Sequence, residues 1–171
     1  MTGSRAGLAG VALASLLASA APAHAEPKHD FELYDLASDR LVNLAKVRRS
    51  ARLVLVDFFS ELCEPCKAAL PGLRRLHQRF AGQGLAVVIV AAPGASDREQ
   101  ALRATQRIFA GQPVPFPVVW DKYWRVAVQY GVVRKRALQL PQAFLVDPQG
   151  VLLRKAVSAA SLDSEIARLL R

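Results

Sequence analysis

Continuous apolar runs along this chain alternate with segments whose apolar residues recur every three or four positions. Two runs, 52–59 and Leu85–Ala91, are rich in β-branched residues, which predicts strands buried on both faces of a sheet. Residues 65–81 between them predict a helix, because their apolar positions share one helical face. These positions are Cys66, Leu70, Leu73, Leu76 and Phe80.

The alternation of strands and helices continues to the end of the chain. Short strands are expected at 31–33 and Leu41–Asn43, within an otherwise irregular lead-in. Further along we expect, in order, a helix capped by Asp97 through Ile108, a strand at Val118–Trp120, a helix over 121–130, paired strands at 142–147 and 151–157, and a helix capped by Ser161. This order predicts an α/β fold.

The first 25 residues have the pattern of a signal peptide. Arg5 precedes an apolar run over 6–21, and the small residues Ala23 and Ala25 flank His24 as in a cleavage site. We expect cleavage after Ala25, which leaves one domain, 26–171, in the periplasm or another extracytoplasmic compartment. The alternative is an uncleaved N-terminal anchor, although the run is shorter than the roughly 20 residues that a membrane span needs.

The formal net charge is +9 at pH 7. The basic residues of the chain stand in short scattered groups, such as Arg74-Arg75 and Arg134-Lys135-Arg136, which is typical of a solvated surface. An exported protein rarely meets nucleic acid, so we expect no nucleic-acid partner. Steering toward acidic partners, or peripheral association with an anionic membrane, stays open. We expect a monomer.

The only two cysteines stand two residues apart, as Cys63-Glu64-Pro65-Cys66. A loop this short restrains almost no unfolded-chain entropy, so the pair is a poor structural crosslink. A zinc site needs four ligands, and beyond the leader only His29 and His77 remain. The spacing therefore favours a redox-active dithiol, with copper(I) binding as an alternative.

The segment 56–67, with its Cys-Glu-Pro-Cys motif, resembles the active-site segment of thioredoxins, with Leu62 where a Trp is usual. The lead-in and the stretch 92–133 are similar to the extracytoplasmic branch of that superfamily, which includes reductases of cytochrome c maturation. The AhpC/TSA and redoxin proteins belong to the same wider superfamily. The resemblance covers about 31–170. One departure is Ala69, where extracytoplasmic members often carry Glu.

The resemblance implies a thioredoxin-like fold, in which helices flank a central mixed β-sheet. It also implies a cis peptide bond before Pro141, with Pro141 facing the disulfide and a client segment docking beside it. Asp57 matches the buried carboxylate of thioredoxins. No cofactor other than the protein's own disulfide is implied.

Each site residue has an expected role. Cys63, at a helix N-terminus, is expected to attack, and the more buried Cys66 to resolve the mixed disulfide. Asp57 is expected to accept the Cys66 proton, or alternatively to hold backbone groups. The negative charge of Glu64, beside Pro65, is expected to disfavour the Cys63 thiolate, and the positive charge of Lys67 is expected to oppose that effect. An apolar docking rim is expected from Leu62, Phe59 and Leu140.

These features predict a reductase of protein disulfides, with apocytochrome c cysteines as one candidate substrate. Its electron donor is expected to be a membrane thiol-transferring protein. A disulfide-forming oxidant is an alternative, although Glu64-Pro65 lacks the His common in such dipeptides. A thiol peroxidase is another, although residues 59–62 lack the Thr or Ser and Pro arrangement that peroxidatic cysteines need.

Overall fold

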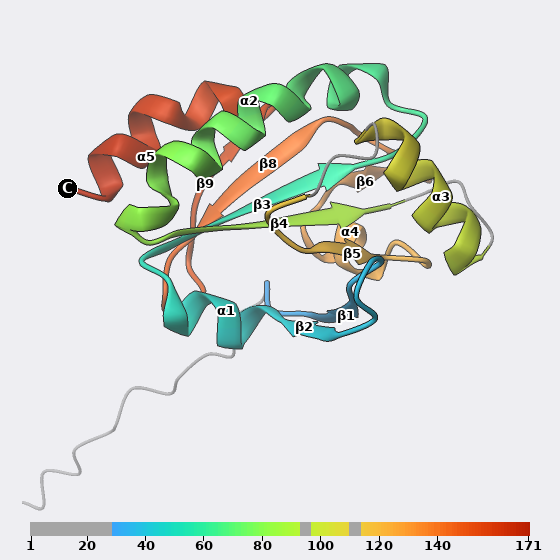
Figure 1. Cartoon of the computed structure of the whole chain (residues 1–171), viewed down its shortest axis with the longest axis horizontal. Helices are drawn as coiled ribbons and strands as arrows, with labels where there is room; N and C mark the ends of the chain where they lie inside the picture. The colour runs from blue at the N-terminus through green and yellow to red at the C-terminus, as the bar shows by residue number, and fades with distance from the viewer. Residues whose placement is uncertain (1–28, 93–96, 110–113) are drawn as a thin grey trace, which may run out of the picture.

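A mixed sheet forms the centre of the fold. The computed structural model describes residues 29–92, 97–109 and 114–171, and within these ranges the sheet has five strands in the order β5-β4-β3-β8-β9 (Figure 1). In chain order they are β3 (Leu53–Phe59), β4 (Leu85–Ala91), β5 (Val118–Trp120), β8 (Gln142–Val146) and β9 (Leu152–Ala156). The predicted signal peptide and its cleavage site lie outside the described residues.

The central strand β3 has a parallel neighbour on one side and an antiparallel neighbour on the other. It pairs with β4 in parallel and with β8 in antiparallel fashion, while β5 extends the parallel half and β9 the antiparallel half. All seven residues of β3 are buried, as its continuous apolar run predicts. The predicted α/β class with a mixed central sheet is therefore confirmed.

Helices cover both faces of the sheet. One buried cluster contains residues of α2 (Glu64–Phe80), α3 (Arg98–Ile108) and α5 (Asp163–Leu169), together with Leu55 and Phe59 of β3. The opposite cluster contains residues of α1 (Leu44–Ser50) and α4 (Arg125–Gln129), together with Val54, Val56 and Phe58. In Figure 1, α2 and α5 lie above the sheet and α1 below it. The alternation along β3 divides its side chains between the two layers.

Two small hairpins and two 3₁₀ turns complete the described structure. β1 (Glu32–Tyr34) pairs with β2 (Leu41–Asn43), and β6 (Val133–Arg134) pairs with β7 (Ala137–Leu138). The 3₁₀ turns are η1 (Ala81–Gln83) and η2 (Ala159–Leu162). No helix in the described ranges is long and apolar enough to cross a membrane.

Three expectations for individual elements were wrong. The lead-in contains α1, whose start is capped by the Asn43 side chain accepting the Lys46 N–H at 2.8 Å. The helix expected over 121–130 shrinks to α4, because Trp124 adopts left-handed backbone geometry, with φ of 56°. Before the last helix, Ser158 and not Ser161 supplies the capping oxygen, to the start of η2.

Candidate active site around the Cys63–Cys66 disulfide

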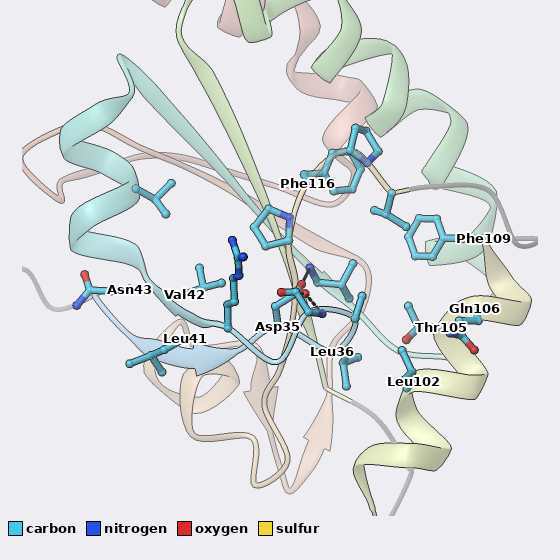
Figure 2. A pocket seen from close by; sticks show the side chains of 18 of the residues that line it. Asp35, Leu36, Leu41, Val42, Asn43, Leu102, Thr105, Gln106, Phe109 and Phe116 are labelled. Atoms are coloured by element: carbon cyan, nitrogen blue, oxygen red, sulfur yellow. Dashed lines mark hydrogen bonds between the residues drawn. The ribbon is translucent and has the colours of Figure 1, made fainter.

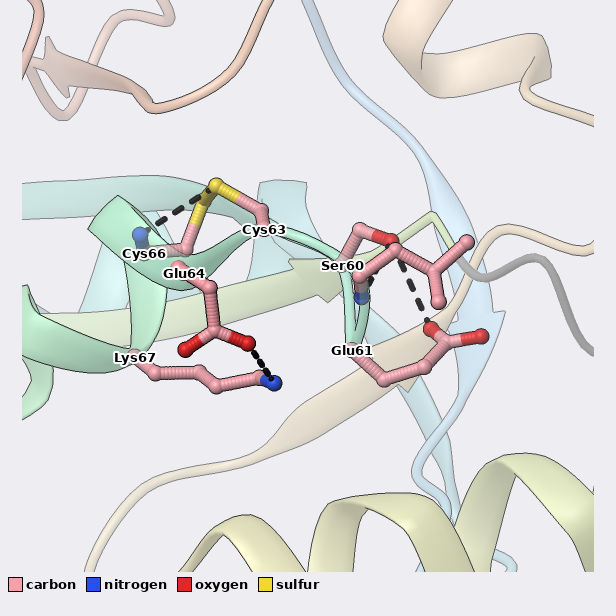
Figure 3. The surroundings of a disulfide bond; sticks show 7 residues. Ser60, Glu61, Cys63, Glu64, Cys66 and Lys67 are labelled. Atoms are coloured by element: carbon pink, nitrogen blue, oxygen red, sulfur yellow. Dashed lines mark hydrogen bonds and ion pairs between the residues drawn. A yellow bond between two sulfur atoms is a disulfide. The ribbon is translucent and has the colours of Figure 1, made fainter.

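The two cysteines form a disulfide at the N-terminus of α2 (Figure 3), with their Cα atoms 5.2 Å apart. Cys63 is the N-cap residue, and its Sγ accepts a hydrogen bond from the Cys66 N–H at 3.2 Å. Pro65 occupies the first turn, where its missing N–H leaves no bond unmade. Free N–H groups at a helix start favour negative charge, so this position suits a Cys63 thiolate.

The two sulfurs differ in their access to solvent. Cys63 is half-buried, whereas Cys66 is only 3% exposed and packs among the core residues beneath α2. A partner's disulfide can therefore reach the Cys63 sulfur more readily than the Cys66 sulfur. This is the asymmetry that an attacking and a resolving cysteine require.

Glu64 and Lys67 form an ion pair beside the disulfide. The Lys67 Nζ lies 2.6 Å from a Glu64 carboxylate oxygen (Figure 3). The Lys67 and Glu64 side chains are 32% and 80% exposed, respectively. The sequence left open which of these charges dominates at Cys63. Because each is paired with the other in solvent, their opposing effects on a Cys63 thiolate largely cancel.

Ser60 shapes the loop between β3 and α2. It is buried, its Oγ accepts the Leu62 N–H at 3.3 Å, and its carbonyl accepts the Cys63 N–H at 3.0 Å. These bonds hold Leu62 on the surface, where it is 78% exposed beside the disulfide. Ser60 was not among the predicted site residues, although a Ser at the start of a short loop is a familiar turn signal.

Asp57 lies in the layer between the sheet and α2. On β3 its side chain alternates with those of Phe58 and Val56, so it faces the same layer as Leu55 and Phe59, whose cluster contains Cys66. The residue is 6% exposed, and burial raises the pKa of its carboxyl group to about 7. Among the described residues, no hydrogen bond or ion pair is made by this carboxyl group.

Leu140 and Pro141 lie at the same end of the sheet as the disulfide. The bond between them is cis. Phe58 is paired with Gln142 in the β3–β8 register, so the next step places Pro141 opposite Phe59, just before the segment that leads to Cys63. Leu140 is half-buried and packs against both core clusters. Phe59, expected in an apolar rim, is instead 2% exposed within the core.

A separate pocket of about 950 Å³ lies between the β1–β2 region, α3 and the segment 114–118 (Figure 2). Its lining includes Leu36, Leu102, Phe109 and Phe116, and none of the residues expected in the active site. Within it the Asp35 carboxylate accepts bonds from Ser38 and from the Val118 N–H. Those bonds fix local backbone, so we assign no chemistry to the pocket.

Within the described ranges, no group of three or more His, Cys, Asp or Glu side chains is arranged to hold a metal ion.

The fold and the disulfide define a protein of thioredoxin-like architecture with a two-cysteine redox motif at a helix N-terminus. The sequence model of the AhpC/TSA family matches residues 25–155. The chain belongs to that family.

Two curated relatives are similar to this chain at just under 30% identity. The thiol-disulfide oxidoreductase ResA of Bacillus subtilis (strain 168) is 29% identical over 113 residues, which is 66% of this chain and 56% of ResA. The thioredoxin-like protein YneN of the same organism is 28% identical over 99 residues, 58% of this chain and 52% of YneN. The chain thus spans little more than half the length of these two relatives.

Solved structures share the fold. A putative thiol:disulfide interchange protein DsbE from Chlorobium tepidum superimposes with a TM-score of 0.66 at 24% identity, over 83% of this chain and 94% of its own. A secreted Mycobacterium tuberculosis disulfide oxidoreductase gives 0.64 at 16% identity, over 84% and 99%. These likenesses confirm the expected thioredoxin-like fold.

Proposed function

We propose that this chain is an exported thiol–disulfide oxidoreductase that reduces disulfides in client proteins through Cys63 and Cys66. The observation that carries the proposal is the asymmetric pair: an accessible Cys63 sulfur that accepts a helix N–H, and a buried Cys66. The similarity to ResA, a thiol-disulfide oxidoreductase, supports the same activity.

The reaction begins with the reduced protein. The Cys63 thiolate attacks one sulfur of the client disulfide, forming a mixed disulfide and releasing the other client sulfur as a thiolate. The Cys66 thiol then loses its proton and attacks the Cys63 sulfur, which releases the second client thiolate. Two electrons pass to the client, and the protein is left with the Cys63–Cys66 disulfide.

The second step requires a base near Cys66, and Asp57 is the candidate. Its carboxyl group faces the layer that contains Cys66 and makes no hydrogen bond or ion pair with the described residues. With a pKa of about 7, it is partly ionised at neutral pH and can accept the thiol proton. The lack of a backbone partner favours this role over a purely structural one.

Client docking is assigned to the surface around Cys63. Leu62 offers exposed apolar area, and Glu64 and Pro65 are exposed next to Cys63. Leu140 and Pro141, which directly precede β8 at this end of the sheet, are assigned as the docking edge. An extended client segment could pair with that edge while its cysteine meets Cys63.

Export and electron supply complete the proposal. The pattern over 1–25 favours a cleaved signal peptide ahead of a domain at 26–171, and the Mycobacterium tuberculosis protein of the same fold is described as secreted. Turnover in that compartment needs a donor of electrons, for which we propose a membrane thiol-transferring protein. Haem-attachment cysteines of apocytochrome c are one candidate substrate.

Trapping tests the mechanism. The Cys66→Ser variant should accumulate mixed disulfides with exported proteins through Cys63, while Cys63→Ser, its matched control, should accumulate none. The wild-type protein should reduce insulin disulfides with dithiothreitol. Failure to trap partners together with absent insulin reduction would contradict the proposal. A stoichiometric copper(I) complex or rapid peroxide consumption in that case would favour a carrier or a peroxidase.

A further inference from the structure

The β6–β7 hairpin has an unusual turn. Its strands pair Val133 with Leu138 and Arg134 with Ala137, so Lys135 and Arg136 form a two-residue turn. Both have positive φ, 49° and 60°, which is the backbone geometry of a type I′ turn. Asn-Gly is the sequence favoured there, and long side chains adopt this geometry less readily. The chain thus places two cations where its own backbone disfavours them.

Three consecutive cationic side chains form the tip of the hairpin: Arg134, Lys135 and Arg136. All three are exposed, and none forms an ion pair with another residue in the described ranges. By contrast Arg48, Arg79 and Arg168 are each paired with a carboxylate. The tip therefore carries uncompensated positive charge, and it complements an acidic surface.

The hairpin is anchored next to the proposed docking edge. The Gln139 N–H donates to the Val132 carbonyl at 2.8 Å, and Val133 and Leu138 pack against the core. From Arg136 the chain runs five residues to Pro141, a reach of at most about 17 Å. An extended client segment at the docking edge would cover that span with about five residues.

From this arrangement we propose that the Arg134–Arg136 tip is a docking surface for acidic residues of the client, within about five positions of the cysteine that Cys63 attacks. The inference rests on the proposed function. The tip would raise the rate of encounter and align the client segment along the edge at Pro141. Clients with acidic residues about five positions from the reactive cysteine would then be reduced preferentially.

The test uses two synthetic peptides that each carry one cysteine as a mixed disulfide with thionitrobenzoate. One has Glu and the other Gln at the fourth and fifth positions on each side of the cysteine. Attack by the reduced protein on the peptide sulfur releases thionitrobenzoate, whose absorbance gives the second-order rate constant. Dividing each rate by that for dithiothreitol removes the intrinsic reactivity of the peptide.

The variant Lys135→Asn/Arg136→Gly removes two charges while installing the turn sequence that best fits the hairpin, so the fold is retained. Its control, Lys46→Gln/Arg49→Gln, removes two exposed charges from α1. α1 precedes the start of β3, whereas the disulfide follows the end of that strand. Wild type and control should prefer the Glu peptide by roughly fivefold at low salt, falling toward one at high salt. The hairpin variant should show a ratio near one.

An unchanged ratio in the hairpin variant, with both peptides still reduced, overturns the docking surface and leaves the proposed function intact. Loss of binding to phosphatidylglycerol vesicles in that variant, without a change in the ratio, also overturns it, in favour of a membrane contact. No thionitrobenzoate release from either peptide, combined with no insulin reduction, contradicts the proposed function itself.

Discussion

The backbone N–H of Cys66 donates a hydrogen bond to the Cys63 sulfur across 3.2 Å. This contact ties the two halves of the motif together, because the residue proposed to resolve the mixed disulfide also presents a donor to the sulfur proposed to form it. Reduction leaves that donor next to a thiolate, and a charge-assisted bond is stronger than a neutral one. The reactivity of Cys63 thus follows from its place at the start of α2.

In the reduced protein, iodoacetamide should modify Cys63 first. Its sulfur is accessible and its thiolate is favoured by the helix N-terminus, whereas Cys66 is buried. Mass spectrometry of peptides from briefly alkylated protein would locate the label. Equal labelling of both cysteines in wild type would contradict the assignment of roles, and a label confined to Cys66 would reverse it.

Asp57→Asn should remove a pH dependence of stability. The carboxyl group titrates at about 7 in the fold and at its usual 3.8 when unfolded, so the unfolded chain releases its proton first as pH rises. Stability from this site is present below pH 3.8 and is lost progressively up to pH 7, by about 4 kcal/mol in total. Urea denaturation of the oxidised proteins between pH 4 and 8 would measure it.

The Asn variant should have a flatter profile and gain stability over wild type as pH rises, although neutral Asn carries its own cost of burial. Parallel profiles for the two proteins would mean that Asp57 is not the buried acid described here.

The same substitution should slow resolution of mixed disulfides. Asp57 acts as a base only when ionised, so its advantage is present above pH 7 and is lost as pH falls through 7. Near pH 8.5, where ordinary thiols ionise by themselves, the advantage also shrinks. We expect a rate deficit of about tenfold or more between these limits, measured by stopped-flow on a preformed mixed disulfide. An identical pH profile would return Asp57 to a structural role.

Separating Glu64 from Lys67 should shift the reduction potential in opposite directions. Lys67→Gln leaves a bare carboxylate beside Cys63, which disfavours its thiolate and makes the pair more reducing, while Glu64→Gln makes it more oxidising. The double variant, as matched control, should return near the wild-type potential. Because the pair is exposed, we expect changes below about 30 mV that fade at high salt. If the reduction potentials of Lys67→Gln and Glu64→Gln shifted in the same direction, the two charges would not act on Cys63 with opposite effects.

The strongest local patterns predicted the parts of the fold that carry the site. The strand Leu85–Ala91 was predicted at its observed bounds, because a continuous apolar run needs burial on both faces. The start of α2 was predicted within one residue, since Pro65 and the spacing of apolar residues both indicate it. Such signals lie within the segment itself, so they predict its structure without knowledge of its tertiary contacts.

Other features depend on contacts that sequence patterns do not record. The β6–β7 hairpin was not predicted, because Lys135 and Arg136 occupy a turn type whose usual sequence signal is Asn-Gly. α4 begins only at Arg125 because Trp124 adopts left-handed backbone geometry, and the Asp121 carboxylate accepts the Ala127 N–H in its first turn, contacts that only the folded chain defines. Likewise, the lack of a hydrogen-bond partner for the Asp57 carboxyl group among the described residues depends on every element packed around it.

The reduction potential of the Cys63–Cys66 pair, measured against glutathione and dithiothreitol buffers, tests the central claim most directly. A protein that reduces client disulfides should have a potential near that of thioredoxin, at about −250 mV or below. A potential near about −120 mV would identify a donor of disulfides and contradict the proposed direction of electron flow, while leaving the fold as described.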